Sequence, residues 1–405
     1  MAGTLVERDQ KRALAAIAVS QLLVLALWFS TAAIVAPLED AWGLSSSETT
    51  YLALAVQLGF VVGALGFALG GVVDAVPARR LFTISAIAGA VANATLLALG
   101  PGDVIWAVAL RFLTGVTLAG VYPSGLKAMS GWFQAGRGMA LGVLVGALTV
   151  GSASPHLVSG LGLDWQGVLL AASGLALLGA AIMAGGVGDG PYETKQSGFE
   201  WRQVGKVLRN RGFRLATYGY LGHMWELYAM WTWTAAWLLA SAEHRGGATG
   251  WVPLATFATI GIGGVGAWLA GRYADRRGRT RAAGLSLAVS GSCAVVTPLL
   301  FGAAPIVVVP VFLIWGFAVV ADSAQFSAMV TEVADGTYRG TALTLQTAIG
   351  FLLTLVTIRG VPLLADAWGW QWAFPVLGLG PVLGIVAMVN LKRSQFAAAL
   401  AGGRG

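Results

Sequence analysis

Charged residues are scarce in this sequence. Asp, Glu, Lys and Arg together make up only 11% of its 405 residues, whereas soluble domains carry about 25%. Hydrophobic residues account for 57% of the chain, and the mean hydropathy is +0.75. A chain of this length with so little charge cannot present most of its surface to water. The composition therefore predicts an integral membrane protein.

Cysteine occurs once, at Cys293. A single thiol can form neither an internal disulfide nor a thiolate metal site. The phosphate-binding pattern Gly-x-x-x-x-Gly-Lys-[Ser/Thr] is also missing, which argues against ATP as an energy source. The sequence has no recognisable nucleophile–base pair or metal-binding cluster, so we expect neither an enzyme nor a cofactor.

Apolar segments alternate with shorter polar ones along the whole chain. A helix needs about 20 apolar residues to cross a bilayer, and by this measure we predict an all-α protein with twelve spans. These are 13–36, 49–73, 80–99, 104–126, 138–160, 165–186, 213–240, 250–271, 281–300, 305–329, 340–364 and 369–391. The longest polar segment separates six spans from six. The predicted divisions are a bundle at 1–186, a cytoplasmic linker at 187–212, a bundle at 213–391 and a cytoplasmic tail at 392–405.

The positive charges follow the order of the spans. Nearly all of the 25 Lys and Arg residues fall on segments that share one side of the predicted membrane. By the positive-inside rule this side is the cytoplasm, so the net charge of +7 requires no nucleic-acid partner. We expect a multi-pass, monomeric protein of the cytoplasmic membrane with both termini in the cytoplasm.

One basic cluster occurs twice. GRYADRRGRTR (271–281) follows the second span of the second half, and GGVVDAVPARR (70–80) follows the second span of the first half. This repetition indicates an internal duplication. The longer cluster closely resembles the major facilitator superfamily signature Gly-x-x-x-Asp-[Arg]-x-Gly-[Arg]-x-[Arg], from which the first copy departs at Ala75 and Pro77.

The resemblance implies a gating latch on the cytoplasmic side, although the arginines could also serve only to set topology. The implied gating residues are Gly70, Asp74, Arg80, Gly271, Asp275, Arg276, Gly278, Arg279 and Arg281. The resemblance extends to Arg111 and Gly115 in ALRFLTGVTLAG (109–120), which match the superfamily's Arg-x-x-x-Gly pattern. It implies two pseudo-symmetric six-helix bundles and transport by alternating access.

The function that this resemblance implies is secondary active transport. We expect a proton-coupled transporter of a small organic solute, and an anionic solute is one form of this expectation. An uncoupled facilitator or exchanger, an efflux pump for apolar compounds and a non-transporting receptor are the alternatives. A nitrate/nitrite porter is a further alternative, but spans 49–73 and 250–271 lack the internal arginines of such porters, and Ala147 replaces the proline of the antiporter signature.

Ionisable residues inside spans are costly and therefore mark candidate sites. His223 and Glu226 lie three residues apart in an aromatic-rich span, so both project from one helix face. Glu226 is the candidate proton carrier, with packing alone as the alternative. Arg111 could bind an anionic substrate or act as counter-ion to Glu226 or Asp322. Asp322 is a candidate for gating or coupling, and weaker candidates for the substrate site are Trp28, Gln57, Trp231 and Gln325.

Overall fold

The computed structural model describes residues 2–133, 137–188, 190–192, 199–335 and 338–404. All regular elements in these ranges are helices, which confirms the predicted all-α class. The chain divides into two compact units, Met1–Gln196 and Ser197–Gly405, called unit 1 and unit 2 below.

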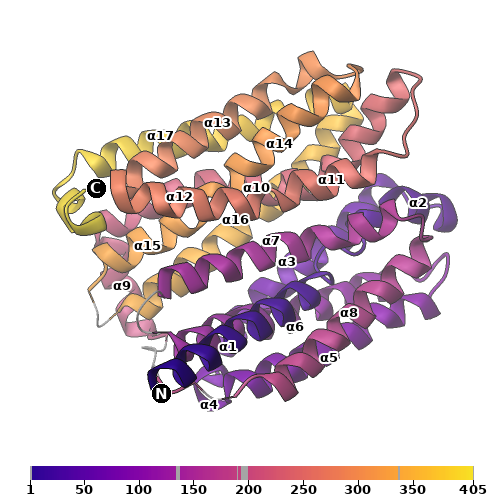
Figure 1. The fold of residues 1–405 in the computed structure, drawn as a ribbon. Helices are drawn as coiled ribbons and strands as arrows, with labels where there is room; N and C mark the ends of the chain where they lie inside the picture. The colour runs from indigo at the N-terminus through magenta and orange to yellow at the C-terminus, as the bar shows by residue number, and fades with distance from the viewer. Residues whose placement is uncertain (1, 134–136, 189, 193–198, 336–337, 405) are drawn as a thin grey trace. The chain divides into compact units, whose positions relative to one another are not determined.

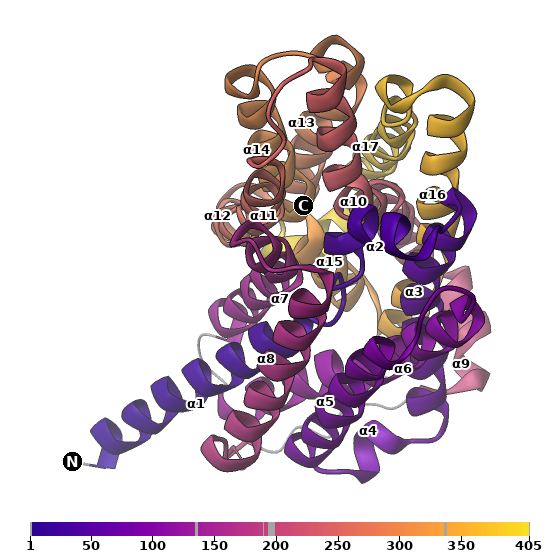
Figure 2. The same cartoon turned by 90° about the vertical axis from the view of Figure 1, so that its right-hand side faces the viewer.

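Unit 1 consists of long helices joined by short turns. Its elements are α1 (Ala2–Leu25), η1 (Ala32–Ile34), α2 (Val35–Trp42), α3 (Ser46–Leu69), α4 (Val72–Ala75), α5 (Ala78–Thr95), η2 (Leu96–Ala98), α6 (Val104–Trp132), α7 (Arg137–Gly160) and α8 (Trp165–Gly186). Within this unit α5 packs between α6 and α8, and α1 packs against α7 and α8 (Figures 1 and 2).

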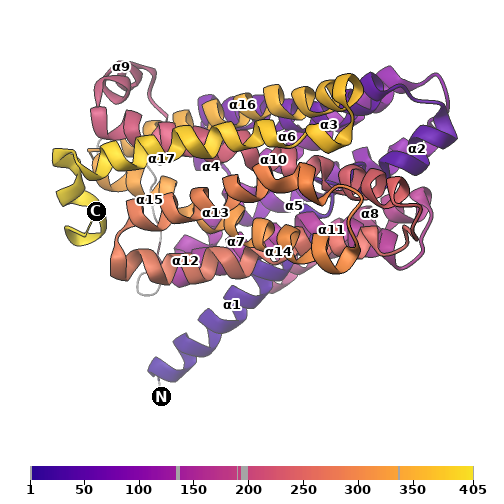
Figure 3. The same cartoon turned by 90° about the horizontal axis from the view of Figure 1, so that it is seen from above.

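Unit 2 has the same helical character. Its elements are α9 (Trp201–Arg209), α10 (Arg211–His244), α11 (Val252–Gly261), α12 (Gly263–Arg277), α13 (Arg279–Leu300), α14 (Pro305–Ala321), α15 (Ser323–Val333), α16 (Arg339–Trp368), η3 (Trp370–Trp372), η4 (Pro375–Gly378), α17 (Leu379–Lys392) and η5 (Gln395–Gly402). Helix α10 packs against α16 and α17, and α13 packs against α14 and α17 (Figure 3).

Ten helical stretches among the described residues are long and apolar enough to cross a membrane. The other two predicted spans fall on α1 and α10, which are 24 and 34 residues long. Charged residues near its start, including Lys11 and Arg12, make α1 too polar, while α10 contains His223 and Glu226 among many aromatic residues. The polar groups that mark the candidate site thus lower the hydropathy of the helix that carries them.

Several predicted spans contain a break, among them 369–391, which comprises η3, η4 and α17. Helix α1 ends at Leu25, so the predicted span 13–36 is not one continuous helix. Helices α11 and α12 meet at Ile262, and α14 and α15 meet at Asp322, which has φ −90° and ψ −15°. The break at Asp322 places the end of one helix and the start of the next beside the polar face of α10.

Glycine allows α3 and α6 to approach each other closely. A Cβ atom at Gly115 would overlap the backbone of Val56, and one at Gly59 would overlap the carbonyl of Phe112. Membrane helices pack through small residues of this kind because no hydrophobic effect drives them together in lipid. The glycine of the Arg-x-x-x-Gly pattern is therefore a packing residue. By setting how α6 packs against α3, it also sets the position of Arg111 along the bundle.

Candidate functional site

Glu226 lies in the interior of unit 2 and is fully buried. Ser290 Oγ on α13 donates a hydrogen bond of 2.8 Å to one carboxyl oxygen of Glu226. Trp315 Nε1 on α14 donates to the other oxygen. Among the described residues, no cation pairs with this carboxyl group. Two neutral donors from two helices therefore hold an acid that lacks a counter-charge.

His223 and Asp322 form a second polar group one helical turn away. His223 Nδ1 lies 2.8 Å from Asp322 Oδ1, and both side chains are at most 2% exposed. On the other side of the ring, His223 Nε2 lies 3.1 Å from the hydroxyl of Ser323. The imidazole thus bridges two adjacent residues at the α14–α15 junction.

The predicted common face of His223 and Glu226 is directed at α14 and at the start of α15. The sequence predicts neither the pairing of Asp322 with His223 nor the contacts of Ser290, Trp315 and Ser323 with these groups. A usable signal was present, because Trp315 and Asp322 are seven residues apart, close to two turns of a helix.

Aromatic rings surround the polar groups of α10. The rings of Tyr220 and Phe326 lie 6.0 and 5.6 Å from that of His223. Trp231 is 1% exposed, and its ring lies 5.8 Å from that of Tyr228. The rings of Tyr220 and Phe326 thus make the surroundings of His223 apolar.

Arg111 is fully buried in unit 1 and forms four hydrogen bonds there. Its guanidinium donates to the carbonyls of Leu27 at 3.1 Å and Trp28 at 2.8 Å, and to Ser30 Oγ and Asn93 Oδ1, both at 3.1 Å. The two carbonyls belong to the segment that follows the end of α1, where helical partners are missing. No carboxylate of the described residues pairs with Arg111.

Asn93 extends this network. Its amide nitrogen donates to the carbonyl of Leu169 at 3.2 Å and to Ser173 Oγ at 3.0 Å, both on α8. Ser30 Oγ also donates to Asn93 Oδ1 at 2.8 Å. Asn93 and Ser30 are not among the site residues predicted from the sequence, although an asparagine within an apolar span is itself a signal for interhelical bonding.

The weaker candidates are buried but differ in their surroundings. Trp28 is 4% exposed, and its ring lies 4.8 Å from that of Phe60. Gln57 is 2% exposed on α3. Gln325 accepts a hydrogen bond of 3.2 Å from Arg279 Nη1 and so belongs to the basic cluster at one end of unit 2.

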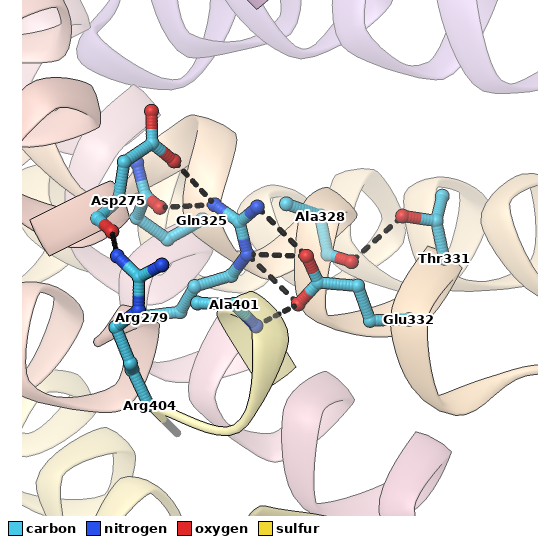
Figure 4. A network of polar contacts seen from close by, with 8 residues as sticks. All are labelled: Asp275, Arg279, Gln325, Ala328, Thr331, Glu332, Ala401 and Arg404. Carbon is cyan, nitrogen blue, oxygen red and sulfur yellow. Dashed lines mark hydrogen bonds and ion pairs between the residues drawn. The ribbon is translucent and has the colours of Figure 1, made fainter. Parts of the chain in front are cut away.

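The second basic cluster is organised around Arg279, at the start of α13 (Figure 4). Its Nε contacts both carboxyl oxygens of Glu332 at 2.8 Å, and its Nη2 lies 2.7 Å from one of them. Asp275 is 72% exposed and 3.7 Å from Arg279 Nη1, a distance at which an exposed pair contributes little. The strong contact of this cluster is therefore Arg279 with Glu332, a residue that the signature does not contain.

Other members of this cluster are less engaged. Gly278 has a φ of 97° and turns the chain from α12 into α13, Gly271 is half-buried, and Arg276 and Arg281 are exposed. The tail also reaches the cluster, because the Ala401 amide donates to Glu332 at 3.1 Å and Arg404 donates to the Asp275 carbonyl (Figure 4).

In the first basic cluster the arginine with hydrogen bonds to another helix is Arg79, the neighbour of the predicted Arg80. Arg79 Nη1 donates to the carbonyls of Ala184 and Val187 at the end of α8, at 3.4 and 3.3 Å. Arg80 and Gly70 are exposed. The side chain of Asp74 lies outside the part of the chain that the structure describes.

Comparison with known proteins identifies the family of this chain. The family model described as "Major Facilitator Superfamily" matches residues 17–357. The chain belongs to this superfamily. It is therefore a multi-pass membrane protein of a transporter family, with the fold that its sequence predicted.

Solved structures of superfamily transporters are similar to it in fold. A bacterial homolog to the human lysosomal transporter Spinster, in an inward-facing and occupied conformation, has a TM-score of 0.70 at 14% identity, covering 94% of this chain and 96% of that one. A mutant of the nucleoside transporter NupG has a TM-score of 0.72 at 13% identity, covering 95% and 100%. No curated protein matches the sequence.

Proposed function

We propose that this superfamily member is a proton-coupled secondary transporter of a small organic solute and that Glu226 carries the proton. The observation that supports this role is the complete burial of Glu226 beside two neutral donors, with no cation from the described part of the chain paired to it. An ionised carboxylate is costly in an apolar bundle unless a positive charge accompanies it. An acid kept in such a place suits a group that takes up and releases a proton as its surroundings change.

The hydrogen bonds are compatible with both forms of Glu226. An ionised carboxylate accepts from Ser290 and Trp315, and a protonated one can still accept from both while its own hydroxyl donates elsewhere. Neither donor carries charge, so neither fixes the acid in its ionised form. A conformational change that admits water or a cation would favour release of the proton.

The pair of His223 and Asp322 can act with Glu226. A neutral imidazole accepts a proton at one ring nitrogen and donates one from the other, and here the two nitrogens face Asp322 and Ser323. Because these two residues occupy the α14–α15 junction, a change in charge at the imidazole would act where the helix is already interrupted. We therefore assign coupling to Glu226 and the His223–Asp322 pair together.

Arg111 has a different role in this proposal. Its bonds to Leu27, Trp28, Ser30 and Asn93 all lie within unit 1 and stabilise the break after α1. This engagement favours a positioning role over direct binding of an anionic solute. A neutral, hydrogen-bonding solute fits the chain as well as an anionic one does.

The orientation that we propose places both termini in the cytoplasm of the cell. The start of α10 and the end of α17 carry the exposed cations Arg211, Arg214, Lys392 and Arg393. The positive-inside rule assigns such an end to the cytoplasm.

The decisive test separates proton binding from solute transport. Infrared difference spectra of the purified protein, titrated from acid to alkaline pH, should contain a protonated-carboxyl band that Glu226→Gln removes. Glu243→Gln is the matched control, because Glu243 lies on the same helix but is exposed. Retention of the whole band in Glu226→Gln would assign the proton to another acid, of which Asp322 is the nearest candidate.

Transport can be tested once a thermal-shift screen against metabolites has identified a stabilising solute. In proteoliposomes, Glu226→Gln should abolish accumulation driven by a proton gradient but retain exchange of labelled for unlabelled solute. Full accumulation in this variant would refute proton carriage by Glu226. If the wild-type protein takes up the solute at the same rate with and without a proton gradient, it is an uncoupled facilitator.

A further inference from the structure

Helix α9, with the sequence WRQVGKVLR, has two chemically different sides. At 3.6 residues per turn, Trp201, Val204, Val207 and Leu208 fall on one side of the helix. Three cations, Arg202, Lys206 and Arg209, fall together on the other side. A helix with an apolar edge beside a basic one is suited to the boundary between lipid and water.

The protein covers only part of the apolar side. Val207 is fully buried, and α9 packs against α10 and α16. The backbone amide of Glu200 donates to Thr341 Oγ1 on α16 at 3.0 Å and fixes the start of the helix. Trp201 and Leu208, in contrast, are 68% and 44% exposed. An apolar edge therefore remains outside the bundle.

The basic side also has no acidic partner among the residues that the structure describes. Arg202, Lys206 and Arg209 are exposed and pair with no carboxylate of the described residues. Glu200 is the adjacent acid, and its carboxylate accepts from Gln203 at 3.4 Å. The three cations are thus available to a negatively charged surface.

The position of α9 identifies that surface. Asn210 alone separates α9 from α10, and its side chain accepts a hydrogen bond from the Phe213 amide while donating to the Val333 carbonyl. Figure 3 shows α9 at the end of unit 2 where α16 begins and α17 ends. Exposed cations of α10 and α17 lie at the same end: Arg211, Arg214, Lys392 and Arg393. A membrane protein meets lipid headgroups at this level.

We propose that α9 is an anionic-lipid anchor, with Trp201 and Leu208 inserted at the interface and Arg202, Lys206 and Arg209 bound to lipid phosphates. Tryptophan prefers this depth because its ring is apolar and its N–H is polar. Phe199 extends the apolar edge, since its ring packs edge-on against that of Trp201 at 5.1 Å. The anchor would hold the first residues of unit 2 against the membrane surface.

Site-directed spin labelling of the full chain tests the anchor. In a Cys293→Ser background, single cysteines replace Trp201, Leu208, Arg202 or Lys206, and the labelled proteins are placed in nanodiscs of phosphatidylcholine with phosphatidylserine. Labels at Trp201 and Leu208 should be relaxed more by oxygen, which concentrates in lipid, than by a water-soluble nickel complex. Labels at Arg202 and Lys206 should show the reverse.

The charge dependence is tested with the label at Leu208. Each lysine or arginine near an anionic surface contributes about a five-fold preference, so Arg202→Gln, Lys206→Gln and Arg209→Gln together should lower the ratio of docked to undocked label about a hundred-fold. Omitting phosphatidylserine should have the same effect on the unmodified helix. Arg245→Gln, at the other end of α10, is the matched control and should leave the ratio unchanged.

Three results would overturn the proposal. Equal access of the nickel complex at all four positions would put α9 in water. Protection of Leu208 from both relaxants would mean that protein covers the apolar edge. Docking that is equally strong without phosphatidylserine would remove the role of anionic headgroups.

Discussion

Replacement of Arg111 by lysine separates a positioning role from direct binding of an anionic solute. The guanidinium forms four hydrogen bonds of 2.8–3.1 Å within unit 1. Three of these bonds start at Nη1 and the fourth, to the Trp28 carbonyl, starts at Nη2; a lysine ammonium has its donors on a single atom, so at least one of the four contacts is lost. A bond to a charged group contributes about 1.5–3 kcal/mol. We therefore expect Arg111→Lys to lower the free energy of unfolding of unit 1 (Met1–Gln196) by about 3 kcal/mol, which for a unit of this size lowers the Tm by about 6–12 °C.

The assay is thermal unfolding of the purified protein in one detergent, with and without the solute found by screening. Arg80→Lys is the matched control, because Arg80 is exposed, and its Tm should stay close to that of the wild type. If Arg111→Lys does not fold, Ser30→Ala removes the contacts of the Ser30 hydroxyl with Leu27, Asn93 and Arg111 but leaves the bonds from Arg111 to the carbonyls of Leu27 and Trp28, and should give a smaller loss. An unchanged Tm together with much weaker solute binding would refute the positioning role and support direct binding of an anionic group.

Three further predictions concern other contacts. Gly115→Ala should destabilise unit 1 by about 1–3 kcal/mol through overpacking against α3, whereas Gly174→Ala, with open space at its Cβ, should be neutral or stabilise by up to about 1 kcal/mol in thermal unfolding. Glu332→Gln removes the charge paired with Arg279, so a cysteine introduced into the α12–α13 turn should react faster with a water-soluble thiol reagent in this variant. An unchanged labelling rate would exclude a latch there. Trp315→Phe keeps an aromatic side chain but removes the indole N–H that donates to the buried acid, and should cost about 1–3 kcal/mol in unfolding and shift the infrared carboxyl band.

The helical fold could be predicted from the sequence because backbone groups in lipid must be bonded within the protein, and apolar runs of about 20 residues achieve this as helices. Even α10 was predicted as a span, since the apolar residues on either side of Glu226 outweigh the local polarity. The break after Leu25 could not be predicted in this way. It depends on Arg111, more than 80 residues away in the sequence, which binds the carbonyls that the interrupted helix leaves open.

The candidate site was predictable in its members but not in its pairings. Glu226, His223 and Asp322 were each identified by the cost of an ionisable group within a span. Which of them meet depends on the rotation of each helix about its axis, which hydropathy does not specify. For the same reason the signature predicted Arg279 but not its partner Glu332, 53 positions further along the chain.

The low hydropathy of α10 also has a consequence for how the protein is made. A helix that enters a bilayer from the translocon partitions according to its own side chains, and a glutamate near its centre opposes that step. Insertion of α10 should therefore depend on helices synthesised after it: α13 supplies Ser290 and α14 supplies Trp315 to the buried acid. The polar chemistry of this helix would make its assembly in the membrane cooperative, with α10 stably integrated only when its later neighbours are present.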